Sequence, residues 1–312
     1  MPHGLDQLLE QARIISVGDC ESIQEILERN NKCMWVHFSP FLVSYSLPPR
    51  RSLYLLEIEG SLVLIQVNVR NGETRTDLLF PPVPYTDKIN SWLTTLPEVV
   101  GQEDVRIIWV DEEEISRLRL EFDENLAWDE KGVEYIYEPK KVWTMEGSEF
   151  RDMRKRVRKA EKNFPDFMDL SVDDIFECQE LLRKWRSLQG RKNSFLLDWG
   201  YTRAALNNFH RFSAENLYGW CVKVQGNVEA FALAGPMNKN TANFFVAKTN
   251  PEFIGLSEYL RWKVLGELRA FSYVNDAGDL GILGLRQHKM KMRPTALQKT
   301  FTATLMTRGA KK

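Results

Sequence analysis

The chain has 312 residues, of which 43% are hydrophobic and 27% charged, which is typical of a globular protein with two domains or one large one and excludes a low-complexity chain. No apolar run approaches the roughly 20 residues that span a bilayer. Residues 1–10 lack the apolar stretch of a secretory signal. We therefore expect a cytoplasmic protein without a transmembrane segment.

The net charge of -1 conceals two halves of opposite charge. Residues 1–139 contain 12 Lys and Arg against 25 Asp and Glu, a net charge of -13. Residues 140–312 contain 30 against 18, a net charge of +12, and the two halves sum to -1. A strongly basic half favours binding to a polyanion. The alternative is that two domains of opposite charge attract each other.

The first half alternates between helical and strand patterns. In chain order, we expect a helix after 18–20, strands at 53–58, 62–69 and 77–80, a helix at 87–96, a strand at 105–110 and a helix beginning at 111–114. The acidic run 111–114 complements the dipole of a helix start, so we interpret it as capping and not as a metal cluster. The polar segment 123–139 predicts a domain boundary.

The second half repeats this order. We expect helices at 148–163, after 171–174 and at 202–212, strands at 217–224, 228–234 and 242–248, a helix at 255–270, a strand at 272–275, a helical turn near 285 and a strand at 297–305. Helices, a three-strand meander, a helix and further strands are the element order of the GNAT fold. The sequence therefore predicts an α/β (α+β layered) protein of two tandem GNAT-like domains, 1–133 and 134–312, with mixed central sheets flanked by helices.

The helix predicted at 148–163 is strongly basic on one face. Its cations are Arg151, Arg154, Lys155, Arg158, Lys159 and Lys162. At about 100° per residue they share an arc of roughly 140°. The apolar residues Phe150, Met153, Val157, Ala160 and Phe164 lie on the other side. Such a face predicts salt-dependent binding of phosphates, in tRNA, an anionic lipid surface or a nucleotide cofactor. The alternative is a face that water alone covers.

The C-terminal region adds a second basic feature. Residues 286–312 contain eight Lys and Arg and no acidic residue. Segment 278–289 combines three glycines with Asp279, Arg286 and Lys289. Glycines permit close approach of a ligand to the backbone, and the N–H groups of a following helical turn attract an anion. A purely structural loop is the alternative.

Several kinds of site are excluded. Cys20, Cys33, Cys178 and Cys221 lack metal-ligand spacing, so we expect free thiols and no metal. Of the four histidines, only His288 lies near the glycine-rich segment. Without an evident nucleophile and base, the remaining chemistry is direct transfer between two bound substrates, with stabilisation of an oxyanion.

Residues near the C-terminal end form a motif that resembles a known family. They are Tyr273-Val274-Asn275, Asp279-Leu280-Gly281, Gly284-Leu285-Arg286, Lys289 and Pro294. This motif resembles the end of a domain family grouped with the C-terminal domain of phosphatidylglycerol lysyltransferases. Segments 134–137 and 77–81 are similar to its central and N-terminal parts, so the resemblance spans nearly the whole chain. The sequence departs from it at Ile282-Leu283, where many relatives carry a polar or acidic pair.

The resemblance implies Fem-like aminoacyl transfer from an aminoacyl-tRNA to an amine or hydroxyl of a lipid head group, peptide or small molecule. No resident cofactor is expected, because the tRNA is a co-substrate. An acyl-CoA-dependent N-acetyltransferase is the main alternative. Segment 251–257 keeps one glycine of the pyrophosphate loop of such enzymes and places Glu252 where the anion binds, which disfavours CoA. A non-catalytic module that binds RNA or an anionic membrane is the other alternative.

The resulting hypothesis gives each candidate residue a role. Arg154, Lys155, Arg158 and Lys159 bind the tRNA backbone, while Arg286 and Lys289 bind the terminal phosphates or stabilise negative charge. Asp279 orients the donor α-amine or the nucleophile. The expected substrate-binding residues are Tyr273, Asn275, Lys248, Gly255 and Ser257.

Overall fold

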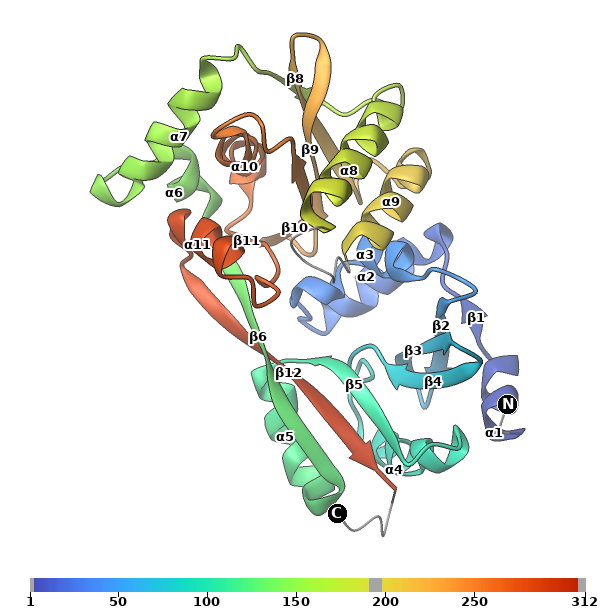
Figure 1. Ribbon diagram of the computed structural model, residues 1–312. Coiled ribbons are helices and arrows are strands. Elements are labelled where there is room, and N and C mark those ends of the chain that lie inside the picture. Colours follow the sequence, from blue (N-terminus) through green and yellow to red (C-terminus); the bar gives the residue numbers. More distant parts are fainter. Residues whose placement is uncertain (1–2, 191–197, 308–312) are drawn as a thin grey trace. The chain divides into compact units, whose positions relative to one another are not determined.

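The computed structural model describes residues 3–190 and 198–307 (Figure 1). The chain forms two compact units, each built from segments that are separated in the sequence. Unit 1 comprises Met1–Lys32, Tyr45–Val133 and Gln298–Lys312, and unit 2 comprises Cys33–Ser44 and Glu134–Leu297. One of the crossings between units lies between residues 133 and 134, where we expect the domain boundary. A single division after residue 133 would place 33–44 in the first unit and 298–312 in the second. In the structure, 33–44 belongs to unit 2 and 298–312 belongs to unit 1.

Unit 1 is a mixed sheet with helices. Its helices are α1 (His3–Glu10), α2 (Cys20–Arg29), α4 (Asp87–Val99) and α5 (Glu112–Phe122), and its strands are β1 (Arg13–Ile14), β2 (Arg51–Ile58), β3 (Ser61–Arg70), β4 (Glu73–Leu78) and β5 (Asp104–Val110), with most of β12 (Ala296–Met306) and the first part of β6 (Leu126–Tyr137). Strands β2, β3 and β4 form an antiparallel meander. Strand β5 lies parallel to β4, as a connecting helix permits. Apolar side chains of these strands pack against α1, α4 and α5 to form the core.

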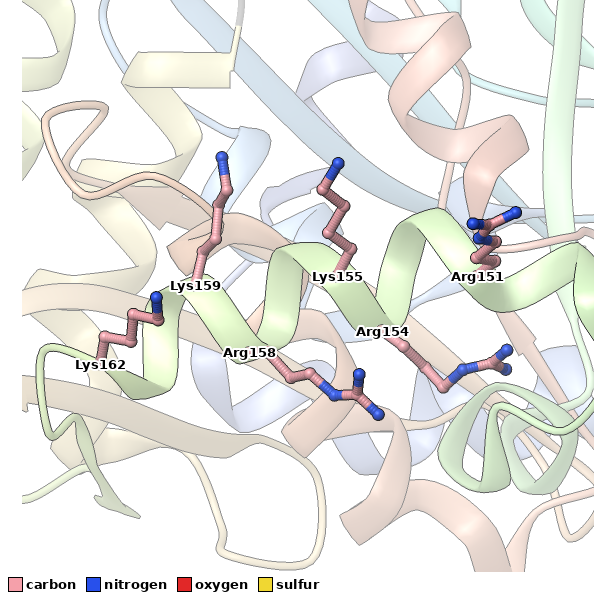
Figure 2. A pocket seen from close by; sticks show the side chains of 6 residues that line it. All are labelled: Arg151, Arg154, Lys155, Arg158, Lys159 and Lys162. Carbon is pink, nitrogen blue, oxygen red and sulfur yellow. The ribbon is translucent and has the colours of Figure 1, made fainter.

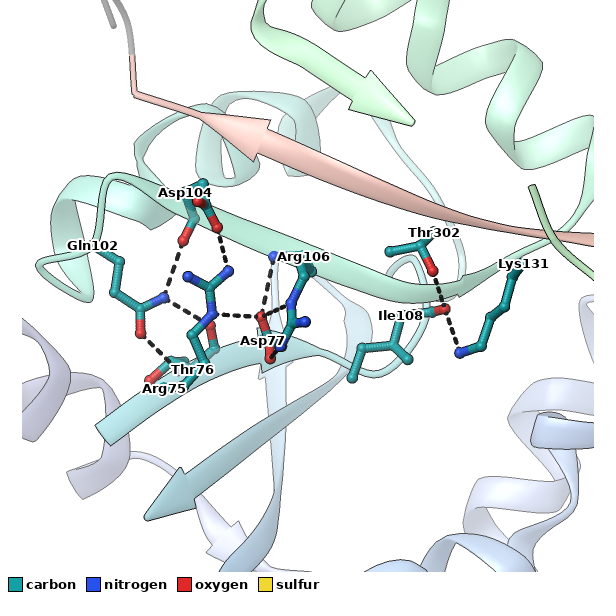
Figure 3. Close-up of polar contacts among 9 residues, drawn as sticks. All are labelled: Arg75, Thr76, Asp77, Gln102, Asp104, Arg106, Ile108, Lys131 and Thr302. Carbon is teal, nitrogen blue, oxygen red and sulfur yellow. Dashed lines mark hydrogen bonds and ion pairs between the residues drawn. The ribbon is translucent and has the colours of Figure 1, made fainter. Parts of the chain in front are cut away.

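A buried carboxylate ties β4 to β5 in unit 1. Asp77 is fully buried, and the guanidinium of Arg106 donates to both of its oxygens, at 3.0 and 2.6 Å (Figure 3). Arg75 donates to Oδ1 of Asp77 at 3.0 Å and also pairs with Asp104. A buried carboxylate needs such charged hydrogen bonds to offset its lost hydration. Asp77 therefore has a structural role in unit 1.

Unit 2 is likewise a sheet with helices, and it has additional helices and a strand before its meander. Its helices are α3 (Ser39–Tyr45), α6 (Pro139–Thr144), α7 (Arg151–Glu161), α8 (Ile175–Gly190), α9 (Asp198–Asn208), α10 (Leu256–Glu267) and α11 (Leu283–Lys291), and its strands are β7 (Asp166–Asp169), β8 (Tyr218–Val224), β9 (Asn227–Pro236), β10 (Thr241–Thr249) and β11 (Tyr273–Asn275). Helix α8 packs on β9 and β10, and α10 packs on the same strands and on α6 and α7. Figure 1 shows α8 and α9 on one side of these strands and α6, α7 and α10 on the other.

The sheet of unit 2 opens between β10 and β11. The two strands pair in parallel only from Thr241–Tyr273 to Asn243–Asn275. Strand β10 then continues to Thr249 alongside β9, with a register irregularity just after Phe244. Beyond Asn243, no strand among the described residues pairs with β10 on its β11 side. Ligands of open α/β sheets bind beyond the carboxyl ends of strands at such a point, so the residues that follow β11 are candidates for a binding site.

The two units exchange their closing strands. Strand β6 follows α5 of unit 1, but its end pairs with β11 of unit 2, where Tyr137 lies opposite Val274. Strand β12 follows α11 of unit 2, but pairs with β5 of unit 1, where Phe301 lies opposite Val110. Each unit thus has a meander, a helix, a strand parallel to the third strand and a helix, as in the GNAT fold. The predicted fold class is confirmed.

A few local features differ from expectation. Helix α7 begins at Arg151 because Ser148–Phe150 form a 3-10 turn. Phe164 was expected on the packed face, but it follows the helix end with a positive φ of 50° and is 89% exposed. Arg308, Lys311 and Lys312 of the basic tail lie outside the described residues. Within the described ranges, every helix is too short or too polar to cross a membrane.

Candidate active site

Helix α7 presents its cations on the face that does not pack. Met153, Val157 and Ala160 are buried against unit 2, which fixes the helix. Figure 2 shows Lys155 and Lys159 extending to one side of the helix axis and Arg154 and Arg158 to the other. All six cations predicted from the sequence nevertheless line one pocket and so share one surface, as helical spacing requires.

These cations have no acidic partners in the described part of the chain. None of Arg151, Arg154, Lys155, Arg158, Lys159 and Lys162 forms an ion pair among residues 3–190 and 198–307. Elsewhere in the chain, exposed cations do pair, as Lys184 does with Glu252 at 2.6 Å. The row of positive charge on α7 is therefore available to a polyanion.

Arg154 differs from the other five. Its guanidinium donates to the carbonyl oxygen of Met145 and, at 2.7 Å, to that of Gly147. Met145 is the left-handed residue that ends α6, so Arg154 completes the hydrogen bonding of that helix end. We expected Arg154 to bind a nucleic-acid backbone. In this structure its donors are instead partly used inside the protein.

Two pockets lie along α7. The larger, about 580 Å³, is lined by the six cations alone. The smaller, about 210 Å³, lies between α7 and α11 and is lined by Asp152, Lys155, Arg156, Lys159 and Lys291. Four cations against one carboxylate make the smaller pocket net positive as well. Arg156 and Lys291 were not predicted as site residues, although both belong to basic runs of the sequence.

Asp279 lies just beyond β11 and forms a hydrogen bond with the buried Tyr135. The hydroxyl of Tyr135 donates to Oδ2 of Asp279 at 2.6 Å, and the backbone N–H of Gly281 donates to Oδ1 at 2.9 Å. Burial of the phenol, and then its hydrogen bond to the carboxylate, raise the pKa of Tyr135 to about 12. Tyr135 therefore stays protonated at neutral pH and orients Asp279. Because Asp279 is only half-buried, its carboxylate remains accessible.

Lys289 points into the protein. Its ammonium donates to the carbonyl oxygens of Asp276 and, at 3.1 Å, of Ala277, and lies 3.8 Å from the Asp276 carboxylate. Complete burial lowers the pKa of Lys289 to about 8, although Asp276 opposes the shift. We expected Lys289 to bind donor phosphates. The structure instead uses it to hold the backbone after β11, three residues before Asp279.

Asn275 and Tyr273 on β11 have different environments. Asn275 is fully buried, donates to the carboxylate of Glu134 at 2.7 Å and accepts from the backbone N–H of Ala277 at 3.0 Å. Its side chain therefore fixes the strand and does not line an open slot as expected. Tyr273 is 44% exposed.

Lys248 on β10 is buried against α8 and α9. Its ammonium pairs with Asp198 and lies 4.0 Å from the ring centroid of Trp185. A buried ion pair of this kind is costly to open. Lys248 is therefore committed to internal contacts, whereas we expected it to face the same slot as Asp279.

Gly255 and Ser257 lie at the start of α10, and Arg286 lies on α11. Gly255 has a positive φ of 88° and contacts the backbone of α7 at Arg156. Its role in the structure is close helix packing. The Ser257 hydroxyl lies 3.2 Å from the ring of His288. Arg286 is exposed on the helix that follows Asp279.

The structure thus brings part of the predicted set together. Helix α11 contributes to three parts of the site. Its Lys289 donates to the backbone after β11, and its His288 contacts Ser257 at the start of α10. Its Lys291 lines the smaller pocket together with residues of α7. Lys248 and Asn275 are bound elsewhere in unit 2. Tyr135 was not predicted as a site residue, although its segment 134–137 forms part of the family resemblance. Within the described ranges, no group of His, Cys, Asp and Glu side chains could hold a metal ion.

The sequence profile described as "Phosphatidylglycerol lysyltransferase, C-terminal" matches residues 50–304, most of the chain. The chain belongs to this family. The resemblance inferred from the C-terminal motif is therefore confirmed. Among proteins with curated functions, no sequence matches this chain significantly.

Solved structures share the fold of this family member. A conserved protein of unknown function from Bacteroides thetaiotaomicron is 20% identical, with a TM-score of 0.75, and the match covers 94% of this chain and 99% of that chain. L-PGS from Bacillus licheniformis is 15% identical, with a TM-score of 0.64 and coverage of 93% and 92%. FemX is 11% identical, with a TM-score of 0.63 and coverage of 93% and 96%. At these identities the matches establish the fold.

Proposed function

We propose that this protein is an acyltransferase that moves an aminoacyl group from an aminoacyl-tRNA to an amine or hydroxyl acceptor. Membership of the lysyltransferase family supports the class of reaction. The acceptor is a lipid head group, a peptide or a small molecule, and the reaction takes place in the cytoplasm, with peripheral membrane contact if the acceptor is a lipid. The tRNA serves as co-substrate, and no resident cofactor is proposed.

The cationic face of α7 carries this proposal. Six cations within the twelve residues 151–162 form a row about 16 Å long at 1.5 Å per residue. Such a row can contact several successive phosphates and release their counterions. A short acyl donor without a polynucleotide does not need so long a row. The absence of ion pairs along α7 among the described residues is what leaves this row available.

The residues after β11 would hold the reacting end of the donor. Asp279, oriented by Tyr135, is an accessible carboxylate that can bind the ammonium of an aminoacyl group. Arg286, one helix turn into α11, can stabilise the negative charge that develops on the ester oxygen. Lys289 acts indirectly, by fixing the carbonyl groups of Asp276 and Ala277.

The contact between α7 and α10 favours a tRNA donor over acyl-CoA. In CoA-dependent GNAT enzymes a loop at a helix start binds the pyrophosphate. Here the backbone of α7 lies directly against Gly255 at the corresponding start of α10. Glu252, in the same segment, adds a negative charge that Lys184 alone neutralises in the described chain. Both features oppose the binding of a pyrophosphate at this helix start.

A transfer assay tests the proposal. Total tRNA charged with radiolabelled amino acids is incubated with the full chain and with phosphatidylglycerol vesicles or a metabolite extract, and the label in non-tRNA products is measured. We expect transfer by the wild type and at least a tenfold lower rate at limiting tRNA for the triple variant Lys155→Ala/Arg158→Ala/Lys159→Ala. Lys88→Ala, which removes an exposed lysine of unit 1, is the control.

Three results would contradict the proposal. Transfer from acetyl-CoA without tRNA would identify an acyl-CoA-dependent enzyme. Salt-sensitive binding of RNA or vesicles without any turnover would identify a binding module. Equal rates for the triple variant and the wild type would remove α7 from donor binding.

A further inference from the structure

Helices α10 and α11 bring a hydroxyl, an imidazole and a carboxylate together in unit 2. The Oγ of Ser257 lies 3.2 Å from Nε2 of His288. The Nδ1 of the same ring lies 3.7 Å from Oε1 of Glu258. The imidazole therefore stands between a hydroxyl and a carboxylate, an order of groups in which histidine transfers protons.

The Ser257 hydroxyl does not cap the N-terminus of α10. Gly255 is the N-cap of α10, and no side chain caps the first turn. Among the described residues, the Ser257 side chain makes one hydrogen-bonding contact, which is the one with His288. Ser257 is half-buried and the His288 side chain is 18% exposed, so both can be reached from solvent.

Glu258 is a buried carboxylate that faces the far side of the His288 ring. Burial raises its pKa, but the contacts with His288, and more weakly with Lys291, leave the pKa below the ordinary value of a glutamate. Glu258 is therefore ionised at neutral pH. An ionised carboxylate beside Nδ1 favours the tautomer that carries its proton there, and this tautomer leaves Nε2 to accept from Ser257.

This group shares α11 with the smaller cationic pocket, and its other helix, α10, begins against α7. Gly255, two residues before Ser257, contacts the backbone of Arg156, and Lys291 lies three residues after His288. Arg156 and Lys291 both line that pocket, together with Lys155 and Lys159. The pocket and the Ser257–His288 pair are therefore connected through α11 and through the contact of Gly255 with α7.

We propose that Ser257 and His288 form the proton relay of acyl transfer and that Glu258 is a positioning residue. This inference rests on the proposed function. As the acceptor amine or hydroxyl bonds to the ester carbonyl carbon, its proton passes to Oγ of Ser257, whose own proton passes to Nε2 of His288. When the bond from the carbonyl carbon to the ribose oxygen breaks, the imidazolium returns a proton through Ser257 to that oxygen. The relay ends in its starting state.

The transfer assay with charged total tRNA and full-length variants tests the relay. We expect His288→Ala and Ser257→Ala each to lower kcat by about 100-fold or more, with KM for tRNA within about twofold of the wild type. Millimolar imidazole should restore part of the activity of His288→Ala, because it can replace the missing ring. His210→Ala, which removes an exposed histidine on another element, should leave kcat unchanged. Thermal melting verifies that each variant is folded.

Each result is informative. An unchanged kcat in both variants overturns the relay and leaves the transferase proposal intact. A loss of kcat in His288→Ala that imidazole does not restore also overturns it, since the ring would then act only by packing. If the wild type transfers from no tRNA, the proposed function fails and the relay fails with it. A lowered kcat with an unchanged KM and imidazole rescue supports the relay.

Discussion

A β-carbon placed on Gly255 would lie 2.2 Å from the carbonyl oxygen of Arg156. Real β-carbons do not approach a backbone oxygen so closely, so any other residue at position 255 must push α7 away from α10. Because α7 carries the cationic row and α10 begins with Ser257, this contact fixes the distance between the proposed donor-binding surface and the proposed relay.

Gly255→Ala should therefore destabilise the protein and weaken RNA binding together. We expect a loss of about 2–4 kcal/mol in the free energy of unfolding, from a strained positive φ and a backbone clash. Denaturant unfolding and RNA titration measure the two effects. Gly226→Ala is the matched control, because Gly226 has a φ of 85° but nothing within 4 Å of a β-carbon. It should cost about 1 kcal/mol and leave binding unchanged. Equal effects of the two variants would argue against a special α7–α10 contact.

Neutralising the α7 row should change the salt dependence of RNA binding. Each phosphate contact contributes about 0.7–0.9 to the slope of log K against log salt. The triple variant Lys155→Ala/Arg158→Ala/Lys159→Ala should therefore lower the slope magnitude by about 2–3, as measured by fluorescence anisotropy with tRNA at several salt concentrations. A slope equal to that of the wild type would mean that these side chains do not contact phosphates.

Asp279→Asn should separate binding from transfer. The amide keeps the size of the side chain and an acceptor for Tyr135 but loses the negative charge. We expect tRNA affinity within about twofold of the wild type and a fall in transfer rate of about tenfold or more, since charged hydrogen bonds contribute about 1.5–3 kcal/mol. A transfer rate that stays at the wild-type value would show that the charge of Asp279 has no part in the reaction.

Lys289 should make stability rise with pH above about 8. Its pKa is about 8 in the folded protein and 10.5 ordinarily, so between these values the unfolded chain binds more protons than the folded one. Stability should therefore increase as pH rises, by about 2 kcal/mol between pH 8 and 9.5. In Lys289→Met this rise should be absent, whereas Lys299→Met, which removes a half-exposed lysine, should retain it. Urea unfolding across this pH range measures the difference.

A fragment of residues 134–312 should not fold on its own. It lacks Cys33–Ser44, which belongs to unit 2 and supplies the buried Phe38 and Phe41. It also lacks Trp35, whose backbone N–H donates to Glu134 at 2.9 Å and whose carbonyl accepts from Asn243 at 2.8 Å.

Losing three buried aromatic side chains removes more than about 5 kcal/mol, comparable with the whole stability of a domain. Circular dichroism melting should show no cooperative transition for this fragment. Residues 134–297 with 33–44 attached through a flexible linker should recover one. Cooperative melting of 134–312 alone would contradict the assignment of 33–44 to unit 2.

Local patterns in the sequence were enough to predict most elements. The helix after 171–174 begins where expected, and Asp174 accepts from both the backbone N–H and the hydroxyl of Ser171, which is one half of a capping box. The break expected between strands 217–224 and 228–234 is the turn Gln225–Gly226, where both residues have a positive φ. Such features depend on residues that are close in sequence.

Features that depend on distant partners were not predictable from these patterns. The apolar run Met34–Phe38 has neither strand nor helix periodicity, so nothing local indicates that it packs in unit 2. Lys289 belongs to a basic tail, and only the chain around Asp276 reveals that it points inward. The contact of Ser257 with His288 joins residues 31 apart, one on α10 and one on α11.

The exchange of closing strands also affects the order in which the protein can mature on the ribosome. Domains generally fold in the order of synthesis, but unit 1 needs β12, which is synthesised after the elements of unit 2, to cover the edge of β5. Until then the β5 edge, with its unpaired backbone groups, is open to wrong pairing. Unit 2 receives β6 before its own sheet is made. Unit 1 thus begins to form before unit 2 and is completed after it.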